Sequence, residues 1–149
     1  MKLTVLEILL NSGWKPGRRQ GIARYRRAFR KRRLRSGLGE DAYLAEYGGL
    51  IIAPKGVTYG AIVFDPRVAI AEVDDTWLNL WEDHLALELI PIGVCGNEIL
   101  LVGTDGGFYG AYGNRVGRLG SDVTKLVDSV FLNPSAWQLR EINRSREGF

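Results

Sequence analysis

The clearest hydrophobic pattern in the chain is a pair of short apolar runs within residues 98–112. The first run, Ile99–Val102, is apolar at four consecutive positions, which predicts a strand that is buried on both faces and central in its sheet. The second run is rich in aromatic residues, and Thr104–Gly107 separates the two. Asp-Gly between two apolar runs is typical of a β-hairpin, because glycine accepts the positive φ of a tight turn. We therefore predict a hairpin that serves as scaffold.

Helical periodicity predicts three helices before the first strand. Over Leu3–Leu10 the polar residues form one stripe on an otherwise apolar rod, and Gly13 is expected to end this helix. The segment Arg19–Leu38 is rich in good helix formers and contains no proline. Its apolar stripe is thin and consists of Ile22, Tyr25 and Phe29. Glu40–Tyr47 is expected to form a third, short helix whose Leu44 and Tyr47 face inward.

Two strands and two helices are predicted next. Leu50–Ala53 and Val57–Phe64 have the composition of strands around a Pro-Lys-Gly turn. Asp65 precedes a proline, which is typical of a helix start with the aspartate as its cap. Asp74 and Asp75 repeat this capping pattern before an amphipathic helix at Trp77–Leu85.

The C-terminal third adds the remaining elements. Ile90–Gly93 is a short apolar segment whose Pro91 is expected at the start of a strand or in an edge strand. Val116–Leu119 is predicted to be a further strand. Ser121 is expected to cap a last helix, which Asn133 and the following proline would end.

This order of elements predicts an α+β fold with a single, mainly antiparallel β-sheet and helices packed against it. We expect one domain over residues 1–133. Residues 134–149 form a polar tail, which is expected either to add a short helix through Leu139 and Ile142 or to be partly disordered.

The composition is that of an ordinary globular domain. Of 149 residues, 46% are hydrophobic and 25% are charged, which suits one domain with a buried core. No apolar run approaches the roughly 18 residues of a transmembrane helix, and Glu7 and Asn11 interrupt the apolar start, unlike a signal peptide. A lone cysteine, Cys95, excludes an internal disulfide and is typical of a reducing compartment. We expect a cytoplasmic protein with no membrane segment.

The net charge of +3 hides a strong asymmetry along the chain. Residues 14–39 contain eleven lysines and arginines and no acidic residue. Residues 40–128 contain fourteen acidic residues against five basic ones, a net charge of −9. A basic segment is therefore attached to an acidic body, and each of them would attract a partner of opposite charge.

The sequence offers little catalytic or metal-binding chemistry. His84, the only histidine, has Asp83 and Glu88 near it, but this set falls short of a zinc site. No serine or cysteine lies in a nucleophile motif, and Cys95 is most simply a small buried hydrophobe. The glycines at 103–110 lack the lysine of a phosphate-binding loop. We expect a protein that is not an enzyme and needs no cofactor or metal.

An ordered set of short motifs resembles the SUKH superfamily of bacterial immunity proteins, most closely its third subtype. The motifs are LEILLNSGWKPGRR at 6–19, AYLAEYGGL at 42–50, FDP at 64–66, PIG at 91–93, LLVGTDGGFYGAYG at 100–113 and LG at 119–120. The resemblance extends over about residues 3–132. The sequence departs from the family pattern after the PIG-like motif, where Val94 and Cys95 stand in place of an acidic residue.

The resemblance implies a single α+β domain that binds and blocks a cognate protein toxin. Such toxins are often nucleases or nucleic-acid deaminases that bacteria deliver to their competitors. The resemblance implies inhibition by occlusion, with no catalytic step. The shared motifs consist mainly of glycines, aromatic residues and turn residues, so they describe the scaffold and carry over no interface residue.

Two charged segments are candidate binding surfaces. The first is acidic and would meet a basic surface of the toxin, with electrostatic steering of the encounter. Its residues are Asp65, Glu72, Asp74, Asp75, Glu82 and Asp83. The competing interpretation, which accounts for this acidic cluster equally well, is that it forms the solvent-exposed first turn of a helix with no binding role.

The second segment is the arginine-rich one, which is the basis of an alternative function in nucleic-acid binding. Its candidate residues are Arg24, Arg27, Arg30, Lys31 and Arg33. The competing interpretation is a solvated helix face, or a helix folded back against the acidic body of the same chain.

Overall fold

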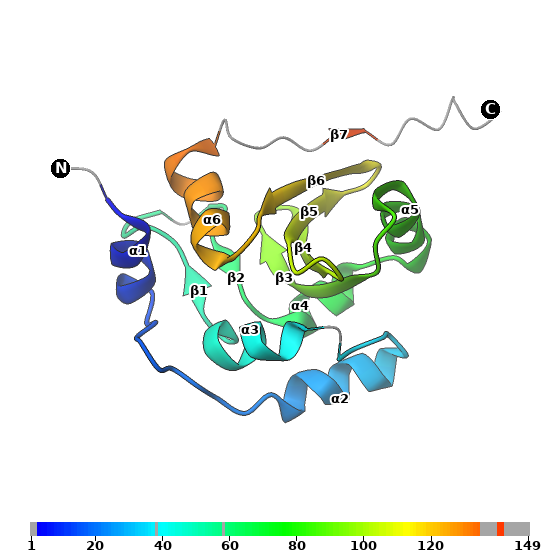
Figure 1. The fold of residues 1–149 in the computed structure, drawn as a ribbon, viewed down its shortest axis with the longest axis horizontal. Coiled ribbons are helices and arrows are strands. Elements are labelled where there is room, and N and C mark those ends of the chain that lie inside the picture. Colours follow the sequence, from blue (N-terminus) through cyan, green and yellow to red (C-terminus); the bar gives the residue numbers. More distant parts are fainter. Residues whose placement is uncertain (1–2, 38, 58, 135–139, 142–149) are drawn as a thin grey trace.

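The computed structural model describes residues 3–37, 39–57, 59–134 and 140–141. One antiparallel sheet runs through the molecule, and its strands lie side by side in the order of the sequence (Figure 1). Six strands form the body of the sheet: β1 (Ile51–Ile52), β2 (Ile62–Val63), β3 (Leu89–Cys95), β4 (Glu98–Gly103), β5 (Phe108–Tyr112) and β6 (Arg115–Gly120). A two-residue strand, β7 (Arg140–Glu141), pairs with the outer edge of β6.

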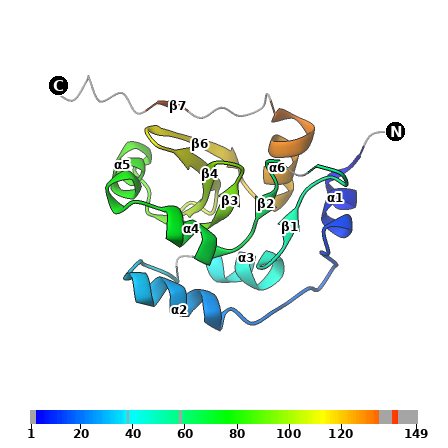
Figure 2. The ribbon, with the colours of Figure 1, turned by 180° about the vertical axis from the view of Figure 1, so that it is seen from behind.

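The helices surround this sheet. They are α1 (Val5–Asn11), α2 (Ala23–Arg32), α3 (Glu40–Tyr47), α4 (Pro66–Glu72), α5 (Asp75–Leu85) and α6 (Val123–Val127), which continues into the π-helix η1 (Asp128–Leu132). Helix α4 lies behind the sheet in Figure 1 and in front of it in Figure 2, where the molecule is turned around. The predicted α+β fold with one antiparallel sheet and helices packed against it is therefore confirmed.

The sheet has two apolar faces, and alternate residues of each strand supply them. On β4, Leu100 packs into the core cluster that contains residues of α1, α3 and α6, whereas Ile99 and Leu101 pack into a second cluster with α4 and α5. This is why β4 is apolar at four consecutive positions, Ile99–Val102: both of its faces are covered. The predicted central strand is thus confirmed.

The hairpin turn also has the expected geometry. Gly106 adopts a φ of 81°, and the N–H of Gly103 donates to the carbonyl of Gly107 across 2.9 Å. Tyr109, on the return strand, donates from its hydroxyl to Asp105 Oδ2 at 2.5 Å, so a side chain closes the turn as well.

Several predicted details of the elements were wrong. The second helix begins at Ala23 instead of Arg19 and ends at Arg32, where Arg33 turns into the left-handed region with a φ of 58°. Before this helix, the N–H of Gln20 donates to the Ala45 carbonyl at 3.0 Å, a tertiary contact that overrides local helix propensity. The first two strands are only two residues long each.

Two further corrections concern Pro91 and Ser121. Pro91 lies inside β3, at the point where the register with β4 shifts, and beyond the residues of β3 that pair with β2. Its missing N–H therefore removes no bond to β2. The last helix is capped by Asp122 instead of Ser121, because Asp122 Oδ1 accepts from the Lys125 N–H at 2.8 Å. The predicted stop at Asn133 is confirmed.

The predicted tail falls mostly outside the described residues. Leu139 and Ile142, through which a short helix was expected, are among those that the structure does not describe. The described pair Arg140–Glu141 is a strand, because it pairs with Val116 and Arg115 of β6. Within the described parts of the chain, no helix has the length and apolar character needed to cross a bilayer.

Candidate partner-binding surface

A hollow of about 650 Å³ opens at one end of the sheet. Because the sheet is a meander, the connections β1–β2, β3–β4 and β5–β6 all lie at this same end. Helix η1 closes the remaining side. The lining residues are Pro54, Val57, Tyr59, Gly60, Cys95, Gly96, Asn97, Glu98, Tyr112, Arg115, Val130 and Phe131.

The rim of the hollow is aromatic and exposed. Tyr59 is 76% exposed and Tyr112 is 58% exposed, although both are large amphipathic side chains. Asn97 Nδ2 lies 3.4 Å from the Tyr59 hydroxyl, and no other hydrogen bond of Tyr59 to a described residue is seen. Tyrosine is among the residue types that contribute most to the centres of protein interfaces. The rim therefore has the composition of a binding surface.

The wall of the hollow contains two titratable groups that burial perturbs. Cys95 is buried, its Sγ lies 3.5 Å from the Gly60 carbonyl oxygen, and burial raises the pKa of its thiol to about 12. Glu98 is half-buried, and burial raises the pKa of its carboxyl as well. No hydrogen bond or ion pair joins the Glu98 carboxylate to another residue that the structure describes. The hollow thus contains a carboxylate that is partly removed from water and that no cation of the described residues compensates.

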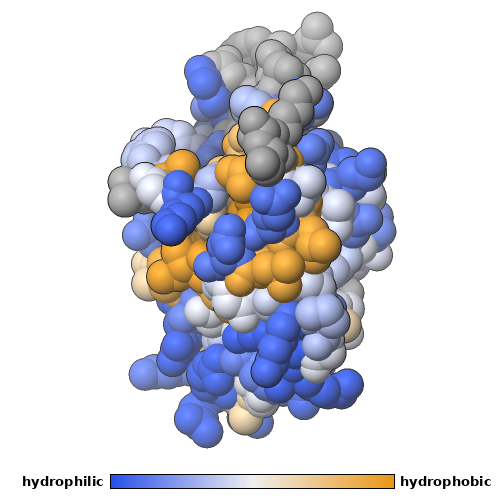
Figure 3. Space-filling model, turned by 90° about the vertical axis from the view of Figure 1, so that its left-hand side faces the viewer, coloured by the Kyte–Doolittle hydropathy of each residue, from blue (hydrophilic) through white to orange (hydrophobic). Residues whose placement is uncertain are grey.

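A second exposed apolar surface lies on helix α1. Leu6 and Leu10 of this helix are exposed, as is Leu3 just before its cap Thr4, while the opposite side of the helix packs into the core. Ile51 of the neighbouring strand β1 is 62% exposed. Apolar atoms gather across the side of the molecule on which α1 and β1 lie (Figure 3). Contiguous exposed apolar surface of this kind is typical of interaction sites.

Part of the sheet edge beside α1 is protected. The side chain of Ser12, just after the helix, accepts from the Ala53 N–H at 3.2 Å and lies 3.3 Å from the Ala53 carbonyl oxygen. The backbone of the residue after β1 is therefore already bonded, which limits the addition of a foreign strand at this edge.

The six acidic residues proposed to contact a toxin have different surroundings. Asp65 caps α4 and pairs with Arg67 at 2.9 Å. Burial acts to raise the pKa of Asp65, but the hydrogen bonds from Arg67 outweigh it and the net shift is downward. Asp74 caps α5 through the N–H groups of Thr76 and Trp77.

Two of the acids bind the chain's own arginines. Asp75 pairs with Arg32 at 2.8 Å, and Glu82 pairs with Arg35 while accepting the Leu89 N–H at 2.8 Å. Glu72 and Asp83 are exposed, and neither has an ion pair with another described residue. Electrostatic attraction to a partner would therefore rest mainly on Glu72, Asp74 and Asp83.

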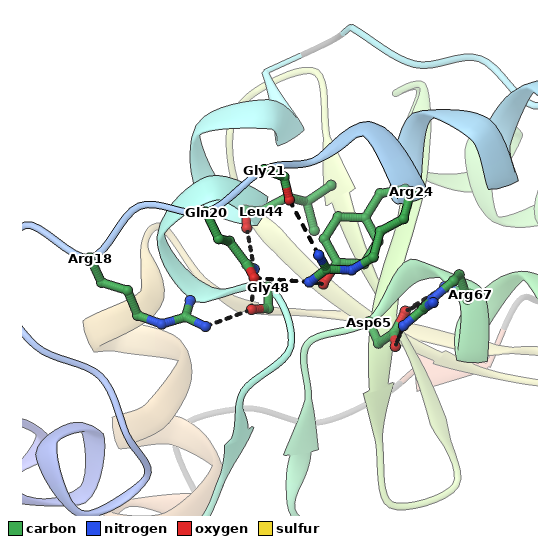
Figure 4. Close-up of polar contacts among 9 residues, drawn as sticks. Arg18, Gln20, Gly21, Arg24, Leu44, Gly48, Asp65 and Arg67 are labelled. Atoms are coloured by element: carbon green, nitrogen blue, oxygen red, sulfur yellow. Dashed lines mark hydrogen bonds and ion pairs between the residues drawn. The ribbon is translucent and has the colours of Figure 1, made fainter.

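The beginning of the basic segment is bound to the body of the protein (Figure 4). Arg18 donates to the carbonyls of Glu46 and Gly48, at 2.6 and 2.9 Å, where helix α3 ends. Gln20 donates to the carbonyl of Leu44 at 3.1 Å and to that of Gly48. Arg24 of α2 lies over the Tyr25 ring and donates to its hydroxyl at 2.7 Å. Arg24, one of the candidate nucleic-acid residues, is thus a structural residue.

The other four candidate cations face solvent. Arg27, Arg30, Lys31 and Arg33 are exposed, and none has an ion pair with another described residue. Arg27 and Arg30 line a shallow hollow of about 360 Å³ beside Arg26, whose guanidinium pairs with Asp41. The segment is therefore folded back on the acidic body in part, and in part it presents a basic face.

The structure brings no metal site together within the residues it describes. His84 is exposed on α5, in the last turn of that helix. The glycines of the hairpin lie in strands and a turn instead of leading into a helix, unlike a phosphate-binding loop.

Sequence reasoning missed the tyrosine rim and the exposed leucines of α1. Tyr59 and Tyr112 are 53 positions apart, and only the meander brings their connections to one end of the sheet. The sequence pattern showed one polar stripe on an otherwise apolar helix, and in the structure leucines outside that stripe are exposed as well. The signal available in the sequence was that α1 has more apolar residues than one side of a short helix can bury.

Comparison with known proteins gives one match. Residues 1–132 match the model of a protein family described as SUKH-3 immunity protein. No curated protein sequence matches the chain, and no solved structure does.

Proposed function

The chain belongs to the SUKH-3 immunity protein family, and on that premise we propose that it neutralises one cognate toxin by binding it and covering its functional surface. The family match extends over all of the described secondary structure except β7. It supports a toxin-neutralising role and leaves the identity of the toxin open. We propose further that the protein acts in the cytoplasm, without a catalytic step, on a toxin that attacks nucleic acid.

The observation that carries the proposal on the structural side is the exposed tyrosine rim around the hollow. Tyr59 and Tyr112 expose most of their surface, although burying an aromatic side chain against a partner is strongly favourable. The hollow between them has the volume of a binding pocket. We propose that the rim and hollow form the centre of the toxin interface.

The acidic residues support a secondary contribution. Glu72, Asp74 and Asp83 are exposed on the acidic body, and enzymes that bind nucleic acid present basic surfaces. Steering by these charges would raise the rate of association more than it would slow dissociation. We propose that they act in this way and that Asp65, Asp75 and Glu82 act mainly within the fold.

The experiment that tests the proposal uses the product of the adjacent gene, expressed as its isolated C-terminal domain, as the candidate toxin. The two proteins are co-expressed and growth is scored, and the purified pair is titrated by calorimetry. We expect rescue and one-to-one binding. The double variant Tyr59→Ala, Tyr112→Ala should weaken binding at least about 30-fold, the effect of losing one interface hot spot.

The matched control is Thr76→Ala, Asn79→Ala on α5, which also removes two exposed polar side chains. It should bind as the wild type does. Absence of binding by the wild type would refute the immunity role. Wild-type affinity of the tyrosine double variant would show that the interface lies elsewhere, and the exposed leucines at α1 would be tested next.

A second candidate function, nucleic-acid binding, is favoured by the four exposed cations Arg27, Arg30, Lys31 and Arg33. If they grip phosphates of a single strand, each contact should add about 0.7 to the slope of log affinity against log salt. The test is titration of a single-stranded oligonucleotide at several salt concentrations. Replacing Arg27, Arg30 and Lys31 with glutamine should abolish binding, whereas Lys15→Gln, another exposed cation, should not.

A further inference from the structure

Three polar side chains lie next to one another across the wall of the hollow. Glu98 begins β4, where it pairs with Cys95 of β3 on one side. On the other side the register of Ile99 with Ala111 brings Glu98 opposite Tyr112. Tyr112 in turn pairs with Arg115 of β6. An acid, an aromatic ring and a base therefore succeed one another on neighbouring strands.

Glu98 is the unusual member of this row. A carboxylate that is half-buried loses part of its hydration, and this loss is normally offset by a cation or by hydrogen-bond donors. Neither is supplied to Glu98 by another described residue. The carboxylate instead borders a hollow that is open to solvent and flanked by two exposed tyrosines. The arrangement leaves room for a donor that comes from outside the chain.

We propose that the hollow receives an arginine side chain of the bound toxin, whose guanidinium pairs with the Glu98 carboxylate between the rings of Tyr59 and Tyr112. The inference rests on the proposed function and names the chemistry of its central contact. A guanidinium donates two parallel hydrogen bonds to a carboxylate and stacks on aromatic faces, so it uses both features of the site at once. A lysine would use only the charge.

The other groups that line the hollow disfavour other kinds of partner side chain. Arg115 lies on the far side of Tyr112, so a cation that enters is attracted to the Glu98 end of the hollow. A carboxylate from the partner would meet Glu98 itself, and a purely apolar side chain would leave Glu98 desolvated without a counter-charge. Cys95 is buried and holds its proton, so it contributes no charge.

The first test is made on the protein alone, with N-acetyl-arginine amide as the probe. In NMR titrations we expect saturable shifts at Glu98, Tyr59 and Tyr112 in the wild type. The shifts should be lost in Glu98→Gln, which keeps the shape of the side chain and removes its charge. N-acetyl-norleucine amide, which has an aliphatic chain and no charge, is the control probe and should give no saturable shift. Equal responses of wild type and variant to the arginine probe would overturn the inference.

The second test uses the same candidate toxin domain. Glu98→Gln should bind it on the order of 10- to 100-fold more weakly than the wild type. Glu88→Gln, at the other end of β3, should bind normally. Tight binding of both variants would overturn the inference and leave the immunity function standing. If the toxin failed to bind the wild type while the arginine probe bound, the proposed function would fail and the guanidinium site would remain.

Discussion

Arg32 Nη1 lies 2.8 Å from Asp75 Oδ1, which joins the last turn of α2 to the first turn of α5. Three residues after Arg32, beyond the end of α2, Arg35 pairs with Glu82 of the same partner helix. The basic segment and the acidic body, which are opposite in charge along the sequence, therefore neutralise each other in part within one molecule. Their long-range fields are correspondingly weaker than the sequence alone implies.

Glu82 should be the most important of these acids for stability. It pairs with Arg35 and accepts the Leu89 N–H at the start of β3, and its side chain is only 12% exposed. Glu82→Ala removes the acceptor of that N–H and leaves the guanidinium with only the more distant Glu88 carboxylate at 3.9 Å, so we expect a loss of about 1–3 kcal/mol of unfolding free energy in urea titrations. Asp83→Ala, the exposed neighbour, should change stability by less than about 0.5 kcal/mol. Equal effects would show that Glu82 is an ordinary surface residue.

Gly48 should tolerate no side chain. A Cβ there would lie 2.4 Å from the Leu44 carbonyl oxygen and 2.8 Å from the Tyr25 ring. Gly48→Ala must shift the end of α3 away from α2, and overpacking of this kind costs about 1–3 kcal/mol. Gly21→Ala is the matched control, since a Cβ there meets no atom within 4 Å. It should leave the protein unchanged or stabilise it by about 0.4–1 kcal/mol. Thermal unfolding of the two variants would separate these outcomes.

Glu98 should make the folded protein less stable as the pH rises. Burial raises the pKa of Glu98 in the folded state, whereas the unfolded carboxyl has a pKa of about 4.3. Between these two values the folded state binds more protons, so the free energy of unfolding falls with pH and the loss is complete above the folded pKa.

Glu98→Gln should therefore raise the melting temperature at pH 7, and its advantage over the wild type should shrink as the pH is lowered toward 4. A wild type more stable than the variant at pH 7 would contradict this prediction. Stabilisation by the same substitution that removes partner binding would indicate that this carboxylate is maintained for function.

Cys95 should react slowly in the folded protein. Its thiol pKa of about 12 leaves about one thiolate in 10⁴ at pH 8, and only the thiolate attacks disulfide reagents. Labelling with Ellman's reagent should be slow in buffer and fast in urea, where the residue is exposed and its pKa returns to about 8.5. A native rate close to that of free cysteine would show that the hollow opens this side chain to solvent.

The sequence was informative where structure depends on neighbouring residues. The hairpin turn at Asp105 and Gly106 was predicted correctly, and so were the helix cap Asp65 and a cap within the pair Asp74 and Asp75, because each depends on contacts within a few positions. Where two good caps are adjacent, as at Ser121 and Asp122, the pattern does not tell which of them is used.

Long-range contacts were not predictable in this way. Helix α2 begins at Ala23, four residues later than predicted, because Arg18 and Gln20 form hydrogen bonds to α3 instead. The candidate site depends on the order of the strands, which brings Tyr59 and Tyr112 to the same end of the sheet. The acidic and arginine-rich segments were recognised as charged, but their pairing with each other was left as one of several possibilities.

The meander has a consequence for how quickly the protein becomes active. Strands β3 to β6 follow one another without interruption from Leu89 to Gly120, and each pairs with the strand that was synthesised just before it. Pairing between sequence neighbours closes only short loops, which favours fast folding. We expect this part of the sheet to assemble by successive hairpins soon after synthesis. Rapid maturation would suit the toxin-neutralising role proposed above, since an inhibitor protects only once it has folded.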